Sequence, residues 1–227
     1  MKIIPLTVLV YEGPMARAYL AAMHEIGIQP QRIIQIVIDH HPATKKPIPR
    51  WLPKGLRLNI ATKVQDLSLH YWSRWLSSHM YDLRAEMIES ISSHMDFSPQ
   101  IYDQILGKLP LLAYCSDVTQ ILVSGYNDPL LKLRLQELGP GAILYTGGGI
   151  VPKDILDIPE LKMLHVHPGH LPDVKGSDGL LWSLMSRSRL GASCFYMEPG
   201  IDTGRIIIAK EFEPVIFPIR SQKRPDD

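Results

Sequence analysis

The stretch that decides the fold lies at the end of an apolar run, in Leu164-His165-Val166-His167-Pro168-Gly169-His170-Leu171-Pro172. An apolar run that ends in Pro and Gly is typical of a buried strand followed by a loop. A second apolar run, residues 192–197, precedes a loop that contains Gly200-Ile201-Asp202-Thr203-Gly204. If both runs are strands of one sheet, two histidines and an aspartate can meet, and an imidazole beside a carboxylate can transfer protons.

Outward from this stretch, apolar runs alternate with helical patterns. The apolar residues 6–11 are followed by Gly13-Pro14, a helical pattern over residues 15–26 that Gly27 ends, and the β-branched run 33–38. A strand, a helix and a strand in so few residues form a βαβ unit, which requires a parallel pair of strands. We therefore predict an α/β fold with a mostly parallel, Rossmann-like open sheet. Further strands are expected at residues 120–124, 142–145, 163–166, 192–197, 206–209 and 212–215, and helices at 128–138 and 178–185.

The middle of the chain departs from this alternation. Residues 42–53 contain four prolines and two lysines, which is typical of a loop. Helical patterns follow over residues 66–93 and 98–110. We predict one domain over residues 1–227 with a helical insertion at about 43–116, and a frayed, charged tail over residues 220–227.

Composition excludes several classes of function. The 227 residues carry a formal net charge of +1, so the chain lacks the basic excess of a nucleic-acid or membrane-surface protein. Its two cysteines cannot form a disulfide framework, and the N-terminal apolar run is too short for a membrane span or a signal peptide. We expect a cytoplasmic location, and the aromatic cluster Tyr71, Trp72 and Trp75 could belong to the core, form a homodimer contact or form a substrate wall.

The two loops resemble those of the folate-dependent formyltransferases, a family that includes glycinamide ribonucleotide, methionyl-tRNA and amino-sugar formyltransferases. The family pattern is Asn-x-His-Pro-Ser-x-Leu-Pro, a Lys/Arg-Gly loop, and later Asp-x-Gly-x-Ile-Ile. The resemblance runs from about Gln120 to the end of the chain. It departs from the pattern at His165, which replaces the Asn, and at Gly169, which replaces the Ser.

The resemblance implies transfer of a formyl group from 10-formyltetrahydrofolate to a primary amine of a small molecule, such as an amino sugar or a nucleotide-linked amine. The absence of an accessory C-terminal domain and of excess basic charge argues against a transfer-RNA substrate. The resemblance also implies catalytic roles for His165, His167 and Asp202. His167 would stabilise the oxyanion, Asp202 would orient His167 and relay protons, and His165 would donate an N–H in place of the Asn.

Each of these residues also has a structural interpretation. His167 could close the turn before Pro168, Asp202 could bond its own backbone in a turn, and His165 could mark a site that has lost catalysis. The protein would then be a catalytically impaired binding protein on the same fold.

Binding residues follow from the same resemblance. Gly147-Gly148-Gly149 lacks the spacing of a dinucleotide fingerprint; its glycines could allow a pterin edge to approach the backbone closely, or could simply form a flexible turn. The expected folate-binding residues are Gly147, Gly148, Gly149, Ile150, Val151, Met197 and Gly200. The expected acceptor-binding residues are Gly13, His170, Lys175 and Ser177.

The spacing of His165, His167 and His170 also permits a metal-dependent hydrolase. Such enzymes need a long barrel after the first strand, for which about 60 residues are too few. We therefore expect no metal.

Overall fold

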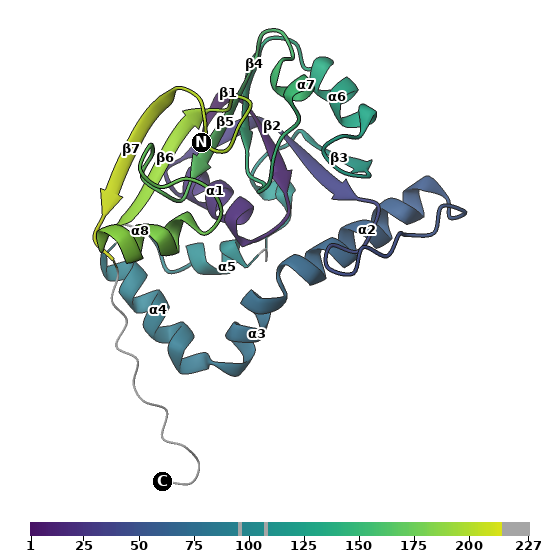
Figure 1. The fold of residues 1–227 in the computed structure, drawn as a ribbon. Coiled ribbons are helices and arrows are strands. Elements are labelled where there is room, and N and C mark those ends of the chain that lie inside the picture. Colours follow the sequence, from purple (N-terminus) through teal and green to yellow (C-terminus); the bar gives the residue numbers. More distant parts are fainter. Residues whose placement is uncertain (95–96, 107–108, 215–227) are drawn as a thin grey trace.

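The computed structural model of the protein describes residues 1–94, 97–106 and 109–214 (Figure 1). Its strands are β1 Lys2–Tyr11, β2 Ile28–Ile38, β3 Val118–Val123, β4 Gly141–Tyr145, β5 Leu161–His167, β6 Leu190–Tyr196 and β7 Ile206–Phe212. Its helices are α1 Pro14–Glu25, α2 Lys54–Leu69, α3 Tyr71–His79, α4 Tyr81–His94, α5 Ile101–Ile105, α6 Pro129–Gln136, α7 Lys153–Leu156 and α8 Gly179–Arg187, with a 3₁₀ turn at Leu111–Ala113. In the described ranges, none of these helices is long and apolar enough to cross a membrane.

The strands form one sheet in the order β3-β2-β1-β4-β5-β6-β7. The first five in this order are parallel, whereas β6 and β7 are antiparallel to their neighbours. This confirms the predicted mostly parallel α/β sheet. The order of strands reverses between β1 and β4, and in open sheets of this kind ligands bind beyond the carboxyl ends of the strands near such a reversal.

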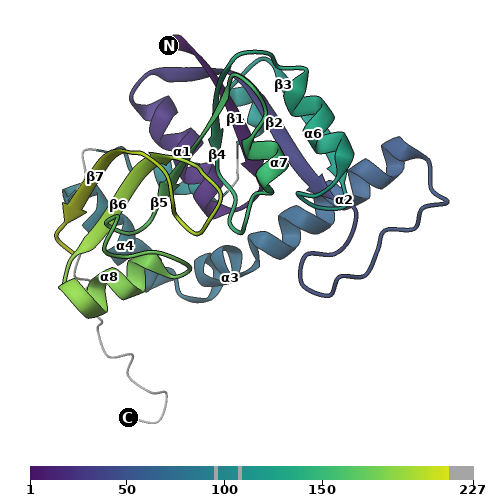
Figure 2. The ribbon, with the colours of Figure 1, turned by 45° about the horizontal axis from the view of Figure 1, so that its top comes forward.

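Helices cover both faces of the sheet (Figures 1 and 2). On one face, β1, β2 and β4 pack against α6 and α7 through a core that includes Leu131, Ile143 and Ile155. On the other face, β1 and β2 pack against α1 and the 3₁₀ turn through Val8, Leu20 and their neighbours. Met163 of β5 belongs to the first layer, so His165 and His167, which follow it at intervals of two, point to the same face as α7.

The helices between β2 and β3 only partly match the sequence-based expectation. One helix over residues 66–93 was wrong: α2 begins earlier, at Lys54, and the path is broken at His70 and Met80. Together α2, α3 and α4 form an arc along the outside of the sheet (Figure 1). Only Ala61 and Gln65 of α2 are buried, so the sequence of this helix needs no apolar stripe. Its first turns therefore lack the amphipathic pattern by which a helix is predicted. The predicted division into one domain with an insertion stays a prediction.

The end of the sheet is also simpler than expected. The two strands predicted at residues 206–209 and 212–215 are one strand, β7, which pairs with β6 from Ile206 to Phe212. The polar pair Lys210-Glu211 does not interrupt β7, because it lies on an edge strand and Glu211 binds Arg187 of α8. Residue 215 and the predicted frayed tail, residues 220–227, lie outside the described residues.

Helix α6 begins as the sequence predicts, with Asp128 as its N-cap and Pro129 in its first turn. Asp128 Oδ1 accepts the N–H of Leu130 at 3.0 Å, and Oδ2 accepts the N–H of Ser124 at 2.8 Å. Asp128→Ala is therefore expected to lower the free energy of unfolding by about 1 kcal/mol, whereas Asp128→Asn, which keeps an acceptor, should lose only a few tenths. Urea denaturation measures both. Equal stability of the alanine variant and the wild type would contradict the cap.

Candidate active site

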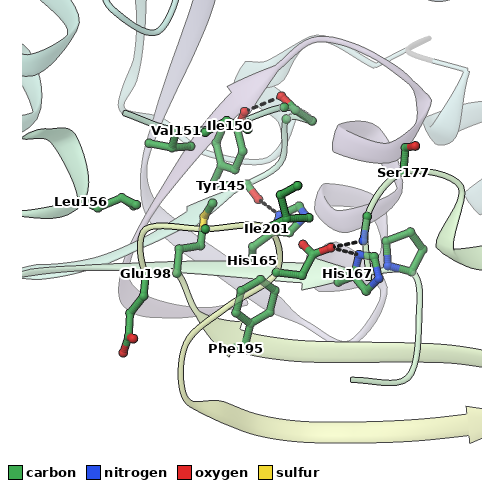
Figure 3. A pocket seen from close by; sticks show the side chains of 18 of the residues that line it. Tyr145, Ile150, Val151, Leu156, His165, His167, Ser177, Phe195, Glu198 and Ile201 are labelled. Atoms are coloured by element: carbon green, nitrogen blue, oxygen red, sulfur yellow. Dashed lines mark hydrogen bonds and ion pairs between the residues drawn. The ribbon is translucent and has the colours of Figure 1, made fainter. Parts of the chain in front are cut away.

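A pocket of about 470 Å³ lies where the loops after β4, β5 and β6 meet (Figure 3). The loop after β4 contributes one wall, and the loop between β6 and β7 folds over the opposite side. Its lining includes all three predicted catalytic residues and all seven predicted folate-binding residues. The remaining lining residues are Tyr145, Leu156, Pro168, Gly176, Ser177, Asp178, Phe195, Glu198 and Ile201.

His167 and Asp202 form an ion-pair geometry in this pocket. His167 is the last residue of β5, and Asp202 lies in the loop that follows β6, so the two strand ends bring them together as predicted. His167 Nδ1 is 3.4 Å from Asp202 Oδ2, and the same oxygen accepts the N–H of Gly176 at 2.6 Å. In the described chain, Asp202 Oδ1 has no hydrogen-bonding partner, so one carboxylate oxygen is left for a ligand.

The second ring nitrogen of His167 is held by the protein itself. His167 Nε2 lies 2.9 Å from the carbonyl oxygen of Val174. A carbonyl oxygen can only accept, so Nε2 carries a hydrogen. The ring is 3% exposed, and a Cβ at Gly169 would lie 2.6 Å from Nε2. The glycine that replaces the family's Ser thus fits the close approach of this ring, and Nδ1 is the nitrogen that faces Asp202.

The backbone of the Asp202 loop explains its glycines. Asp202 has φ of +47°, a left-handed conformation that Asp and Asn adopt more readily than most residues. Gly204 has φ of +121°, and a Cβ there would collide with the carbonyl oxygen of Tyr196. The Asp-Thr-Gly sequence therefore builds the turn that returns Asp202 over the sheet to His167.

His165 lies on the same face of β5 but makes different contacts. Its Nδ1 is 3.0 Å from the carbonyl oxygen of Tyr145, the paired residue on β4. The ring packs near Tyr145 on one side and Phe195 on the other, with centroid distances of 5.7 and 6.0 Å. This burial lowers the pKa of His165 below its ordinary value, so the neutral ring is favoured. His165 makes no direct hydrogen bond to His167 or Asp202.

The glycine loop after β4 is packed against two tyrosines. Tyr145 Oη donates to the carbonyl oxygen of Gly148 at 2.8 Å. A Cβ at Gly147 would lie 2.6 Å from Tyr126 Oη, so a larger residue there would displace the loop or the ring. Burial raises the pKa of Tyr126 to about 12, which keeps its hydroxyl protonated. The loop is therefore a shaped wall rather than an open turn.

The predicted acceptor-binding residues are not gathered at this pocket. Ser177 lines it, whereas Gly13, His170 and Lys175 do not. The Gly13 N–H binds Glu12 Oε1 at 3.1 Å, and His170 Nδ1 lies 3.3 Å from Asp173 Oδ2. Phe195, which the sequence analysis did not single out, lines the pocket because it pairs with His165 on the neighbouring strand β6.

A second polar cluster lies on the other face of the sheet and was not predicted. Glu12 is buried after β1, and its carboxylate receives Arg17 Nε at 2.7 Å and Arg17 Nη2 at 2.9 Å. His70 Nε2 and Gln35 Nε2 each lie 3.0 Å from the same carboxylate. Burial would raise the pKa of Glu12, but the hydrogen bonds from His70 and Arg17 outweigh it and lower the pKa to about 2. Because these contacts join α1, α2 and β2, the cluster fixes their packing.

Glu12, Asp66 and His70 are the group in the described ranges that could hold a metal ion. It includes none of His165, His167 and His170, so the structure does not assemble the three imidazoles of the hydrolase alternative. Both oxygens of Glu12 already bind the Arg17 guanidinium, whose charge would repel a cation there.

The described chain therefore combines a mostly parallel α/β sheet with a loop pocket in which a histidine lies beside an aspartate. Residues 124–222 match the model of the family described as "Formyl transferase". This segment, which is less than half of the chain and contains His165, His167 and Asp202, is similar to the formyltransferase family. The resemblance based on the two loops is thereby confirmed.

Similar curated proteins match the same part of the chain. The chain is 36% identical over 89 residues to the methionyl-tRNA formyltransferase of Syntrophus aciditrophicus (strain SB), covering 38% of this chain and 28% of that protein. It is 34% identical over 80 residues to the same enzyme of Clostridioides difficile (strain 630), covering 34% of this chain and 26% of that protein. The match therefore spans little more than a quarter of these relatives.

Two solved structures are similar over most of the chain. The phosphoribosylglycinamide formyltransferase from Bacillus halodurans is 12% identical with a TM-score of 0.47, covering 94% of this chain and 80% of that one. A sugar N-formyltransferase from Shewanella sp FDAARGOS_354 is 13% identical with a TM-score of 0.43, covering 94% of this chain and 58% of that one.

Proposed function

We propose that the protein transfers a formyl group from 10-formyltetrahydrofolate to a primary amine of a small molecule. The observation that carries the proposal is the approach of His167 to Asp202 in a pocket formed by the two family motifs. The folate is consumed in this reaction and is therefore a substrate rather than a resident group.

The pocket suits a flat, largely apolar ring with polar edges. Ile150, Val151, Leu156, Met197 and Ile201 provide apolar contacts, and the Gly147 to Gly149 backbone offers N–H and C=O groups. The tight contact of Gly147 with Tyr126 leaves this wall without side chains that would block a pterin. We therefore assign the pterin ring to this wall and the reacting carbon to the side of His167.

His167 and Asp202 divide the proton chemistry between them. As an amine attacks the formyl carbon, negative charge develops on the formyl oxygen, and preorganised donors stabilise that charge. His167 Nδ1 is the ring nitrogen available for this role, because Nε2 is held by Val174. Because Nε2 already carries a hydrogen, Nδ1 can donate to the oxyanion only from the imidazolium form of the ring, whose charge the Asp202 carboxylate 3.4 Å away would balance. Asp202 orients the ring and can pass a proton from the amine to the leaving nitrogen through Oδ1.

The charges of the pocket favour an amine over a phosphate as its direct ligand. Asp178, Glu198 and Asp202 line it, and within the described residues no lysine or arginine does. A cationic amine is attracted by such a surface, whereas a phosphate is repelled. The acceptor would thus present its amine to this pocket and keep any phosphate outside it.

The proposal also includes a homodimer, which the exposed Tyr71 and Trp72 on α3 support, and a cytoplasmic location.

Calorimetry with a non-reactive reduced-folate analogue, followed by mass spectrometry of a panel of primary amines, tests this function. We expect saturable binding of the analogue and an N-formyl product from at least one amine. Gly147→Ala should weaken analogue binding by about tenfold or more, because its Cβ displaces the wall. Gly55→Ala, which has open space around it, is the matched control. Folate binding without turnover of any amine would favour the catalytically impaired binding protein, and absence of binding would refute both.

A further inference from the structure

We propose that His165 is the general base of this site, and that its Nε2 takes a proton from the ammonium form of the acceptor. The inference rests on the proposed formyl transfer and assigns His165 a role opposite to that of an N–H donor. The amide that the family places here can donate a hydrogen but is far too weak a base to remove one from an ammonium ion.

The hydrogen bond to Tyr145 decides which ring nitrogen of His165 is basic. The carbonyl oxygen of Tyr145 has no hydrogen, so Nδ1 of His165 must donate across the 3.0 Å contact. In a neutral imidazole only one nitrogen carries a hydrogen, and Nε2 is then left with a lone pair. The neutral ring in this position can accept a proton at Nε2 but has no N–H there for an oxyanion.

Nε2 is also accessible to a substrate. In the described chain Nε2 of His165 has no hydrogen-bonding partner. It is absent from the set of polar atoms that are both buried and without a partner, so Nε2 is open to solvent. The ring lines the pocket together with His167 and Asp202. An acceptor amine that reaches the formyl carbon beside His167 therefore meets Nε2 in the same space.

The surroundings favour the neutral ring at rest. Burial between β4 and β6 is the largest effect and lowers the pKa of His165. The groups that face the ring are the Tyr145 carbonyl from β4, the Phe195 ring from β6, His167 from its own strand and Asp202 from the loop after β6. The Tyr145 carbonyl and Asp202 favour protonation and His167 opposes it, so the ring can still accept a proton in passing.

The proton balance of the reaction is complete with this base. The acceptor R–NH₃⁺ gives one proton to His165 Nε2, and the freed electron pair forms the bond to the formyl carbon while the C=O electrons move to oxygen. A second amine proton passes to the leaving folate nitrogen through Asp202, the bond from carbon to that nitrogen breaks, and the C=O bond is restored. His165 then releases its proton to water, leaving the formamide and tetrahydrofolate.

His165→Asn separates the two roles of this position. It restores an amide donor and removes the base, so kcat/KM for an alkyl amine, which is an ammonium ion at neutral pH, should fall by about 10²-fold or more. For an amine that is already neutral at that pH, such as an alkoxyamine, the loss should be under about tenfold. His41→Asn, in the exposed loop before α2, is the matched control. Equal losses for the two amines, or an unchanged or faster His165→Asn, would overturn the proposal.

The pH profile provides a second readout. For the wild type with the alkyl amine, kcat/KM should fall on the acidic side, with a midpoint below the ordinary pKa of histidine, because protonated His165 cannot act as a base. With the neutral amine the wild type should lack that limb, and with the alkyl amine the residual activity of His165→Asn should lose its midpoint. Persistence of the same limb in the variant would assign it to another group and contradict the base.

Nitrogen-15 spectroscopy of histidine-labelled protein tests the tautomer without any turnover. We expect His165, identified by its absence from the His165→Asn spectrum, to carry its hydrogen on Nδ1 near neutral pH. A hydrogen on Nε2 would overturn the base even if formyl transfer is active. The expected tautomer in a protein that formylates no amine would instead refute the proposed function, and the base with it.

Discussion

Replacement of Asp202 by asparagine is expected to lower kcat for formyl transfer by about 10²–10⁴-fold while changing folate binding little. The substitution removes the carboxylate that faces His167 Nδ1 and that would relay the amine proton. Asparagine is nearly the same size, tolerates the left-handed φ of +47°, and can still accept the Gly176 N–H. The loss should therefore fall on the chemical step. Steady-state kinetics and calorimetry with a folate analogue measure the two effects separately.

Asp157→Asn is the matched control, since Asp157 is an exposed carboxylate at the end of α7 that pairs with Lys153 outside this pocket. It should leave kcat within a factor of about two, because exposed ion pairs contribute little. His167→Ala should reduce kcat at least as strongly as Asp202→Asn, but it also deprives the Val174 carbonyl of its donor and opens a cavity. A normal kcat for Asp202→Asn, with unchanged folding, would remove Asp202 from the mechanism.

Replacement of Glu12 by glutamine is expected to destabilise the protein by about 3–5 kcal/mol. The carboxylate is 3% exposed and Arg17 is 8% exposed, so the change leaves a buried guanidinium without its counter-charge. An amide also cannot accept from Arg17, His70 and Gln35 together, because one of its two polar atoms is a donor. Urea denaturation near neutral pH measures the loss.

The same residue determines a pH dependence of stability. The pKa of Glu12 is lowered from 4.5 to about 2 in the folded protein, so its contribution is fully present above pH 4.5. As the pH falls from 4.5 towards 2, the unfolded chain takes up a proton that the folded protein excludes, and the contribution is lost. The stability of Glu12→Gln should therefore depend less on pH in this window than that of the wild type.

Glu137→Gln is the control for this prediction. Glu137 pairs with Arg134 at 2.9 Å on α6, but both side chains are about half exposed, so the expected change is below about 1 kcal/mol. A Glu12→Gln protein as stable as this control, or one with the wild-type acid sensitivity, would show that the buried cluster does not secure α1 and α2 to the sheet.

Local pattern was sufficient for the elements that have strong periodicity and clear ends. The apolar runs predict every parallel strand, and Asp128-Pro129 predicts the start of α6. It failed in the helical segment, where α2 begins twelve residues before the predicted residue 66. The reason is physical: α2 buries few side chains, so its first turns carry no apolar stripe that distinguishes a helix from a loop.

The two motifs by themselves indicated the likeness to formyltransferases, the pocket loops and the meeting of His167 with Asp202, because strands of one sheet place their following loops within reach of one another. The sequence could not determine which nitrogen of each histidine is free. That choice depends on two carbonyl oxygens, Val174 for His167 and Tyr145 for His165, and on the burial that disfavours a charged His165 ring. The sequence could not predict the Glu12 cluster either, since residues 12, 17, 35 and 70 come together only when α1 and α2 pack on the same face of the sheet. Hydrogen-bond direction and desolvation depend on neighbours that are distant in the chain, and only the tertiary structure brings them together.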